Sequence, residues 1–200
     1  APRKDAVPPV AVLKPGGALS DQVPEDVRGF ELRRSMGMTS RLYALFADPA
    51  ALPLLMRPVL LAKRASQTLP YLPALVRYLR GARPDALLSA TPHLNLEAIW
   101  GRRLAGVQTR LLVSERSAPS QKLPVSKNWR HRHLPPLIRR TYPMADVIVS
   151  VSQALGDDLS AVTGLPRDIV RTIYNPVVGD DIERKARAEE LKGMDALREA

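Results

Sequence analysis

The stretch that decides the fold is Arg83–Gly106, RPDALLSATPHLNLEAIWGRRLAG. A Pro-Asp turn signal precedes Ala86–Ala90, a short apolar run with the length of a buried strand. Residues 91–93 break this run, and from residue 94 onward apolar residues recur with the period of a helix, which Gly106 ends. The stretch therefore predicts a strand, a loop and a helix, with Arg102 and Arg103 pointing away from the apolar helix face.

The same alternation continues on both sides of this unit. Later apolar runs that predict buried strands are Thr109–Val113, Val147–Val151 and Val170–Ile173. Helical patterns lie at Leu69–Gly81, within Asn128–Tyr142 (split by Pro135 and Pro136) and at Ala154–Val162. Weaker strand candidates lie at Val7–Leu13, which its prolines shorten to Val10–Leu13, and at Val27–Leu32. Strands that alternate with helices predict an α/β fold with a doubly wound parallel sheet.

Composition limits the possible chemistry. The 200 residues contain no cysteine and three histidines, so disulfides and thiol catalysis are excluded, and we expect no metal site. The formal charge is +10 and the isoelectric point about 10.4, which favours an anionic partner such as nucleic acid, an acidic membrane surface or a phosphorylated substrate. No run in the sequence is long and apolar enough to predict a membrane-spanning helix.

Two acid-free runs, 57–83 and 116–140, carry much of the positive charge. They form either a solvated basic face or a surface that docks on anionic lipid or a diphosphate. Nucleic acid is the weaker hypothesis, because no aromatic residues are interleaved for base stacking. Residues 31–67 allow two interpretations as well: helices packed on the sheet, or a basic apolar surface that rests on lipid.

Polar side chains follow three of the predicted strands, at what should be one edge of the sheet. They are His93, Asn95, Glu115, Arg116, Ser117 and Ser152. Each has two interpretations. His93 is a loop residue or a ligand, and Glu115 with Arg116 is a surface ion pair or part of a binding site. Ser152 caps the next helix, whose N-terminus can also hold an anion.

A family resemblance adds to this interpretation. Residues 75–117, LVRYLRGARPDALLSATPHLNLEAIWGRRLAGVQTRLLVSERS, resemble the second half of the N-terminal domain of family 4 glycosyltransferases. YPMADVIVSVSQALGDDL at 142–159 and TIYNPVV at 172–178 resemble two later elements of that family, in the same order. The resemblance implies a GT-B enzyme, in which two Rossmann-like domains transfer a sugar from a nucleotide-sugar donor with retention of anomeric configuration.

The resemblance also implies roles for individual residues. His93 and Glu115 would be catalytic, and Asn95, Arg116 and Ser117 would bind the acceptor, with no protein nucleophile, no metal and no other cofactor. Asn175 and Pro176 would form the turn by which the chain leaves the domain. Many family members carry a histidine near the position of Glu115, and this sequence departs from them there.

Domain organisation follows from the same comparison. We expect residues 1–178 to form a glycosyltransferase N-terminal domain that is incomplete at its start, and 179–200 to form a polar helical tail. The donor-binding half of the family would then lie outside this chain. The expected acceptor is a glycan or a polyprenyl-diphosphate-linked sugar, at the cytoplasmic face of an anionic membrane. The alternative is a non-catalytic binding domain of the same fold.

Overall fold

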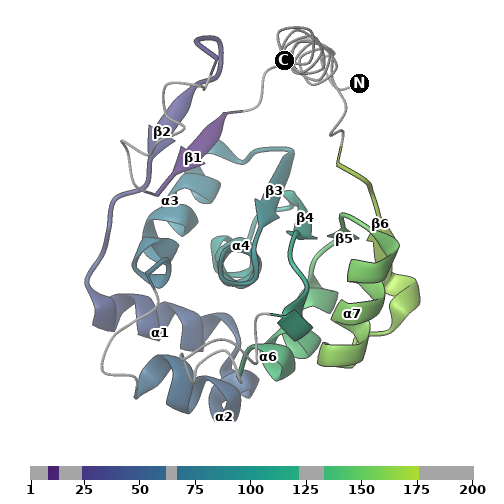
Figure 1. The fold of residues 1–200 in the computed structure, drawn as a ribbon. Coiled ribbons are helices and arrows are strands. Elements are labelled where there is room, and N and C mark those ends of the chain that lie inside the picture. The colour runs from purple at the N-terminus through teal and green to yellow at the C-terminus, as the bar shows by residue number, and fades with distance from the viewer. Residues whose placement is uncertain (1–8, 14–23, 62–66, 122–132, 176–200) are drawn as a thin grey trace, which may run out of the picture.

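The computed structural model describes residues 9–13, 24–61, 67–121 and 133–175 (Figure 1). The larger sheet has four parallel strands in the order β3-β4-β5-β6. The strands are β3 (Ala86–Ala90), β4 (Arg110–Glu115), β5 (Val147–Ser150) and β6 (Val170–Thr172). Since neighbouring strands are also consecutive in the sequence, every connection within this sheet proceeds in one direction.

A smaller sheet lies beside β3. It consists of β1 (Val10–Val12) and β2 (Gly29–Glu31), which pair in parallel but form no hydrogen bonds with the larger sheet. Figure 1 shows β1 between β2 and β3. The chain therefore runs outward from β1 to β2, returns, and runs outward again in the other direction from β3. This reversal confirms the α/β, doubly wound prediction and places the switch point between β1 and β3.

Helices connect the strands. Those between β2 and β3 are α1 (Gly37–Ala47), η2 (Pro49–Ala51), α2 (Leu52–Leu55), η3 (Met56–Leu60), η4 (Leu69–Tyr71) and α3 (Leu72–Ala82). Those between later strands are α4 (Pro92–Ala105), α6 (Leu134–Thr141), η6 (Tyr142–Met144), α7 (Gln153–Thr163) and η7 (Arg167–Ile169). Helix α4 contacts α1, α3 and α6, so it lies at the centre of the helical layer.

The core is aliphatic and lies between the larger sheet and its helices. Leu111 and Val113 of β4 are fully buried there, together with Trp100 of α4 and Ile148 of β5. Each large apolar side chain buried in this way contributes roughly 1.5–3 kcal/mol. The opposite face of β3 is open, because Leu88 is 69% exposed.

Several predicted boundaries were wrong. Helix α4 begins at Pro92 rather than after residue 93, because a proline at the first helical position is already set to helical φ and needs no N–H partner. Strand β4 begins at Arg110 and continues through Glu115. Helix α3 ends one residue later than predicted, at Ala82, with Arg83 in the left-handed region. Gly106 ends α4 as predicted, with φ of 67°.

Other expectations changed in detail. Arg102 does not point into solvent: it donates to the carbonyls of Thr109 and Met144 and pairs with Asp146, so it ties α4 to the strands. Pro135 and Pro136 do not split α6 but lie in its first turn. The weak strands are shorter than predicted, as the bounds of β1 and β2 show. The expected tail at 179–200 lies outside the described residues.

Candidate functional site

Strand register brings the predicted site residues to one edge of the larger sheet. Ala90 pairs with Ser114, Glu115 with Ser150, and Ser150 with Thr172. The residues that follow these pairs therefore leave the sheet at its carboxyl edge. These residues include His93, Arg116, Ser152 and Asn175. In doubly wound folds this edge, next to the switch point, is where ligands bind.

A buried polar cluster lies directly under this edge. Glu115 is 1% exposed, and Asn95 and Tyr142 are fully buried. The Tyr142 hydroxyl donates to Oε1 of Glu115, and Nδ2 of Asn95 lies 3.2 Å from the same oxygen. Nδ2 of Asn95 also lies 3.0 Å from the Ser114 carbonyl oxygen and 3.0 Å from the Tyr142 hydroxyl. Asn95 and Glu115 were predicted to be loop residues that contact ligand, whereas both are enclosed.

The electrostatics of this cluster hold Tyr142 in its protonated form. Burial raises the pKa of Tyr142 well above its ordinary value, and the Glu115 carboxylate raises it further. Tyr142 therefore remains a hydrogen-bond donor to Glu115. Oδ1 of Asn95 has no hydrogen-bond partner among the described residues, although it is buried. The cluster thus fixes the positions of α4 and the end of β4 relative to each other.

The turn between β3 and α4 is strained. Thr91 has φ of 80° and ψ of 145°, which is an outlier for a β-branched residue. Its N–H donates to the Ser114 carbonyl, which also accepts from Asn95. Backbone strain of this kind costs roughly 1–3 kcal/mol and is concentrated at functional sites. The strained turn leads directly into the helical turn that carries His93.

His93 is the second residue of α4 and is half-buried. Glu97 lies one helical turn further, so both side chains share a face of α4. Glu97 is buried and lines a cavity of about 200 Å³ with Ala11 and Leu13 on one side and β3 on the other. Burial raises the pKa of Glu97 to about 8, although the hydrogen bond from Thr68, at 2.5 Å, opposes the shift.

The remaining candidates occupy the exposed rim. Nη2 of Arg116 donates to Oδ1 of Asn175 at 3.1 Å, which joins the loop after β4 to the segment after β6. Ser117 lies beside Arg116 and is half-buried. Ser152 caps α7 as predicted, since its hydroxyl accepts from the Leu155 N–H at 3.2 Å. Pro176 lies outside the described residues.

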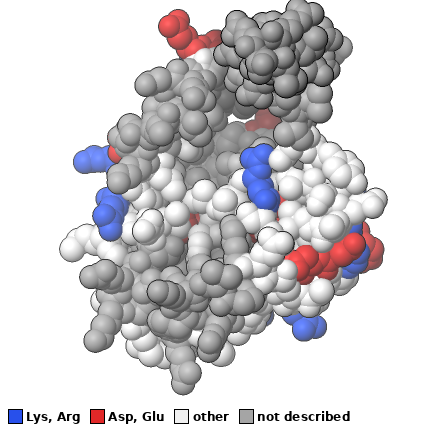
Figure 2. All heavy atoms as spheres, in the orientation of Figure 1, with Lys and Arg blue, Asp and Glu red and all other residues white. Residues whose placement is uncertain are grey.

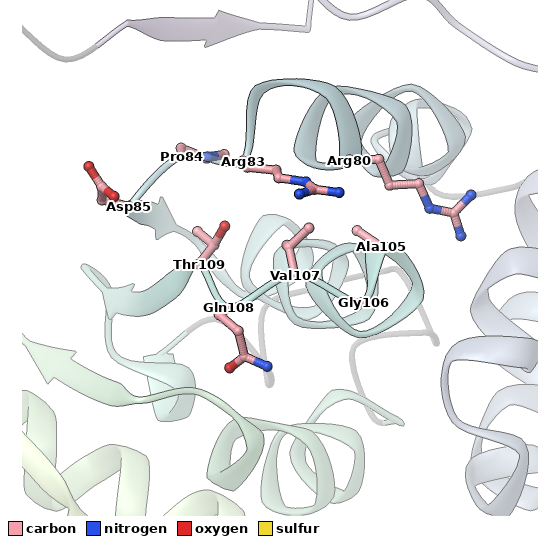
Figure 3. A pocket seen from close by; sticks show the side chains of 9 residues that line it. All are labelled: Arg80, Arg83, Pro84, Asp85, Ala105, Gly106, Val107, Gln108 and Thr109. Carbon is pink, nitrogen blue, oxygen red and sulfur yellow. The ribbon is translucent and has the colours of Figure 1, made fainter.

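A cavity larger than the one beside Glu97 lies at the opposite edge of the sheet. A cavity of about 650 Å³ opens at the amino edge of the sheet, where the Gly106–Thr109 loop meets the ends of α3 and α4 (Figure 3). Arg80 and Arg83 reach over it, and Arg80 donates to the Leu104 carbonyl at 2.7 Å. Arginines here complement the negative ends of two helix dipoles, so a structural role accounts for them.

The sequence matches the profile described as Glycosyltransferase Family 4 over residues 31–180. The chain belongs to glycosyltransferase family 4. The matched segment runs from the end of β2 past β6, so it contains the carboxyl edge of the larger sheet and the Asn95–Glu115–Tyr142 cluster. No curated protein matches the sequence. The fold corresponds to the N-terminal, Rossmann-like half of a GT-B glycosyltransferase.

Sequence reasoning missed two residues of this glycosyltransferase domain. Tyr142 was predicted only as the last residue of a helical segment, yet it is the donor that holds Glu115. Glu97 was not singled out, although a carboxylate within the otherwise apolar run 96–100 of a predicted helix is a signal of a buried acid. Both depend on partners far away in the sequence, which periodicity does not reveal.

A metal site and a membrane-spanning helix are both absent from the described part of the chain. Among the described residues, no three His, Asp or Glu side chains gather closely enough to hold a metal ion. Within the same part of the chain, no helix combines the length and apolar character that crossing a bilayer requires.

Proposed function

We propose that this chain is the acceptor-binding domain of a retaining glycosyltransferase that takes its sugar from a nucleotide-sugar donor. The proposed acceptor is a glycan or a polyprenyl-diphosphate-linked sugar at the cytoplasmic face of a membrane. The observation that carries the proposal is the placement of His93 and of the Arg116–Asn175 pair at the same carboxyl edge of a family 4 domain, next to the Asn95–Glu115–Tyr142 cluster.

The proposed roles follow from exposure. His93 lies at the start of α4 and is the residue that would contact the transferred sugar. Arg116, paired with Asn175, would hold a hydroxyl or phosphate oxygen of the acceptor, and Ser117 beside it would add a hydroxyl donor. Ser152 marks a helix N-terminus that would face an anionic group. Glu115 is enclosed, so its proposed role is to position Asn95 and the end of β4 rather than to contact substrate.

The test is a sugar-transfer assay on the chain alone and on the chain co-expressed with a C-terminal domain of family 4. Each preparation is given a panel of nucleotide sugars and detergent-solubilised polyprenyl-diphosphate-sugar acceptors, and released nucleotide is measured. We expect turnover from the completed enzyme. His93→Ala should lower kcat/KM at least 100-fold, which is about 2.7 kcal/mol of transition-state stabilisation.

Gln108→Ala is the matched control, because Gln108 is exposed at the opposite edge of the sheet. It should leave turnover within twofold of the unsubstituted enzyme. Equal losses for His93→Ala and Gln108→Ala would contradict the proposed site. A folded, completed enzyme that transfers no sugar from any donor would favour the non-catalytic binding domain.

A further inference from the structure

Arg167, in η7, joins helix α7 to strand β6. Its Nε donates to Oδ1 of Asp157 in α7 at 2.6 Å, and its Nη1 donates to the carbonyl of Val170, the first residue of β6, at 2.7 Å. Its Nη2 makes a longer contact, at 3.4 Å, with Oγ1 of Thr172, the last residue of β6. We call these three contacts the Arg167 clamp. A single guanidinium thus spans the length of β6 and fixes it to α7, which packs beside it (Figure 1).

The ion pair within the Arg167 clamp contributes little by its charge. The side chain of Asp157 is 67% exposed. Figure 2 shows a group of acidic side chains at the surface over α7. An ion pair in contact with water is screened and adds little to stability. The carboxylate of Asp157 therefore mainly orients the guanidinium, and the directional bonds to β6 account for the structural effect of the clamp.

Gly156 of α7 leaves the space that the guanidinium occupies. A Cβ built on Gly156 would lie 2.8 Å from Cζ of Arg167, 2.9 Å from its Nη2 and 2.9 Å from Oγ of Ser150. The backbone of Gly156 is that of an ordinary helix, because its N–H donates to the Ser152 carbonyl at 3.1 Å. Alanine is the better helix former at such a position. The glycine is therefore explained by the room that it gives to its neighbours and not by its backbone conformation.

Strand β6 leads directly into the candidate site. It lies at the end of the strand order, with β5 as its one neighbour in the sheet. Among the described residues, the segment after β6 makes one backbone hydrogen bond, from the Ile173 N–H to the Ser150 carbonyl at 2.9 Å. The same segment carries Asn175, whose Oδ1 accepts from Nη2 of Arg116 at 3.1 Å. The position of this pair therefore depends on how firmly the Arg167 clamp holds the end of β6.

We propose that Arg167 is a positioning residue: it holds the segment after β6 so that Asn175 keeps Arg116 in place for the acceptor. The part that concerns the acceptor rests on the proposed function, whereas the holding of the segment does not. Arg167 itself is assigned no contact with substrate, because its Nε and both Nη atoms already bond to the protein. Loss of the clamp should therefore weaken acceptor binding and leave the chemical step unchanged.

The first experiment measures acceptor kinetics in the enzyme completed by a family 4 C-terminal domain. Gly156→Ala displaces the guanidinium without changing any charge. Arg167→Lys keeps the charge, but one ammonium group cannot reach α7 and both ends of β6. Both variants should raise the acceptor KM about 10-fold with kcat within about threefold, because loss of uniform binding raises KM alone. Gly81→Ala is the matched control, since Gly81 lies in α3 with no atom within 4 Å of an added Cβ, and its KM should stay within twofold.

A double-variant cycle tests whether Gly156 acts through Arg167. Arg167→Leu removes all three contacts and should also raise the acceptor KM about 10-fold. Adding Gly156→Ala to Arg167→Leu should raise KM no further, because the new Cβ then meets no guanidinium. Additive losses would overturn the assignment of Gly156 to Arg167. A raised KM in Arg167→Leu alone, with Gly156→Ala and Arg167→Lys normal, would show that charge acts in place of positioning and would overturn the proposal.

Hydrogen–deuterium exchange of the same proteins tests the clamp without any sugar transfer. The amides of residues 171–175 should exchange about fivefold faster in Gly156→Ala and Arg167→Leu, whereas Gly81→Ala should leave them unchanged. Circular dichroism should show all variants folded.

The two measurements separate the positioning role from the proposed function. Unchanged exchange in both Gly156→Ala and Arg167→Leu would overturn the positioning role, whether or not sugar is transferred. Faster exchange with an unchanged acceptor KM would overturn the link to acceptor binding. A completed enzyme that transfers no sugar would overturn the proposed function, and the exchange rates would still decide whether Arg167 holds the segment after β6.

Discussion

Acidic side chains are buried at one edge of the larger sheet and exposed at the other. At the carboxyl edge and the switch point, Glu97 and Glu115 are buried, and burial raises the pKa of Glu97 to about 8. At the amino edge Asp85 and Asp146 are exposed, and the Leu111 N–H lowers the pKa of Asp146. The amino edge, which has the larger of these two cavities, thus carries solvent-exposed acids. The carboxyl edge and the switch point, with the smaller cavity, contain the buried hydrogen-bond network. The buried polar network and the larger cavity therefore lie at opposite edges of the sheet.

The largest expected effect is the pH dependence that Glu97 produces. Unfolded, Glu97 ionises near pH 4.5, whereas folded it keeps its proton until about pH 8. Between these values the native state holds the extra proton, so stability falls as pH rises. Compared with Glu97→Gln, which retains a partner for Thr68, the native chain should lose roughly 3 kcal/mol between pH 5 and pH 8.5. Denaturant melts of both proteins at several pH values measure this difference, and parallel pH curves would contradict it.

The next effect compares buried hydroxyls at the two edges. Tyr142→Phe removes the donor to Glu115 and leaves a buried carboxylate short of a partner, which should cost about 2 kcal/mol. Thr109→Val removes a buried hydroxyl that has no hydrogen-bond partner among the described residues, so it should be neutral or slightly stabilising. Urea melts at pH 7 measure both. If both substitutions lower the unfolding free energy equally, the hydrogen bond from Tyr142 to Glu115 adds nothing to stability beyond what the Thr109 hydroxyl contributes.

These contrasts also show what the sequence could predict. Strand β3 was predicted to the residue, because a Pro-Asp turn and Thr91-Pro92 bound an apolar run. The stop of α4 at Gly106 and the cap of α7 at Ser152 were predicted because each depends on one residue's own backbone or side chain. The predicted start of α4 was wrong because Pro92 was interpreted only as a residue that ends a strand or helix, although proline also favours the first turn of a helix.

The sequence predicted the sheet edge at which the candidate residues lie, but it did not predict the buried contacts that these residues make. Strand alternation placed His93, Glu115 and Ser152 at one edge, and the parallel register confirms that placement. The enclosure of Glu115 was not predictable, because its donor Tyr142 is 27 residues further along the chain and enters from η6. Contacts across the core depend on how α4 and η6 pack, and a one-dimensional pattern does not contain that information.

A smaller effect is expected at the amino edge, from Asp146. Its lowered pKa means that the native state favours the ionised form, so its contribution is present at neutral pH and is lost as pH falls below its ordinary value of 3.8. Asp146→Asn should cost about 1 kcal/mol at pH 7, because Asp146 is partly exposed and its pair with Arg102 is screened. The difference between the two proteins should shrink progressively as pH falls below 3.8, which acid titration of the unfolding free energy checks. A difference that does not change as pH falls below 3.8 would show that the side chain acts by packing.

The smallest effect concerns the strained turn above the network. Thr91 adopts φ of 80°, a conformation that glycine tolerates, and its exposed side chain makes no capping hydrogen bond to α4. Thr91→Gly should therefore relieve strain and, after the entropic cost of glycine, raise the unfolding free energy by about 0.5 kcal/mol. Thr39→Gly, at an exposed position inside α1, is the matched control and should lose about as much instead. If the turn holds His93 in place for sugar transfer, the more stable Thr91→Gly enzyme should be the slower one. A variant that is both more stable and fully active would show that the strain has no part in the site.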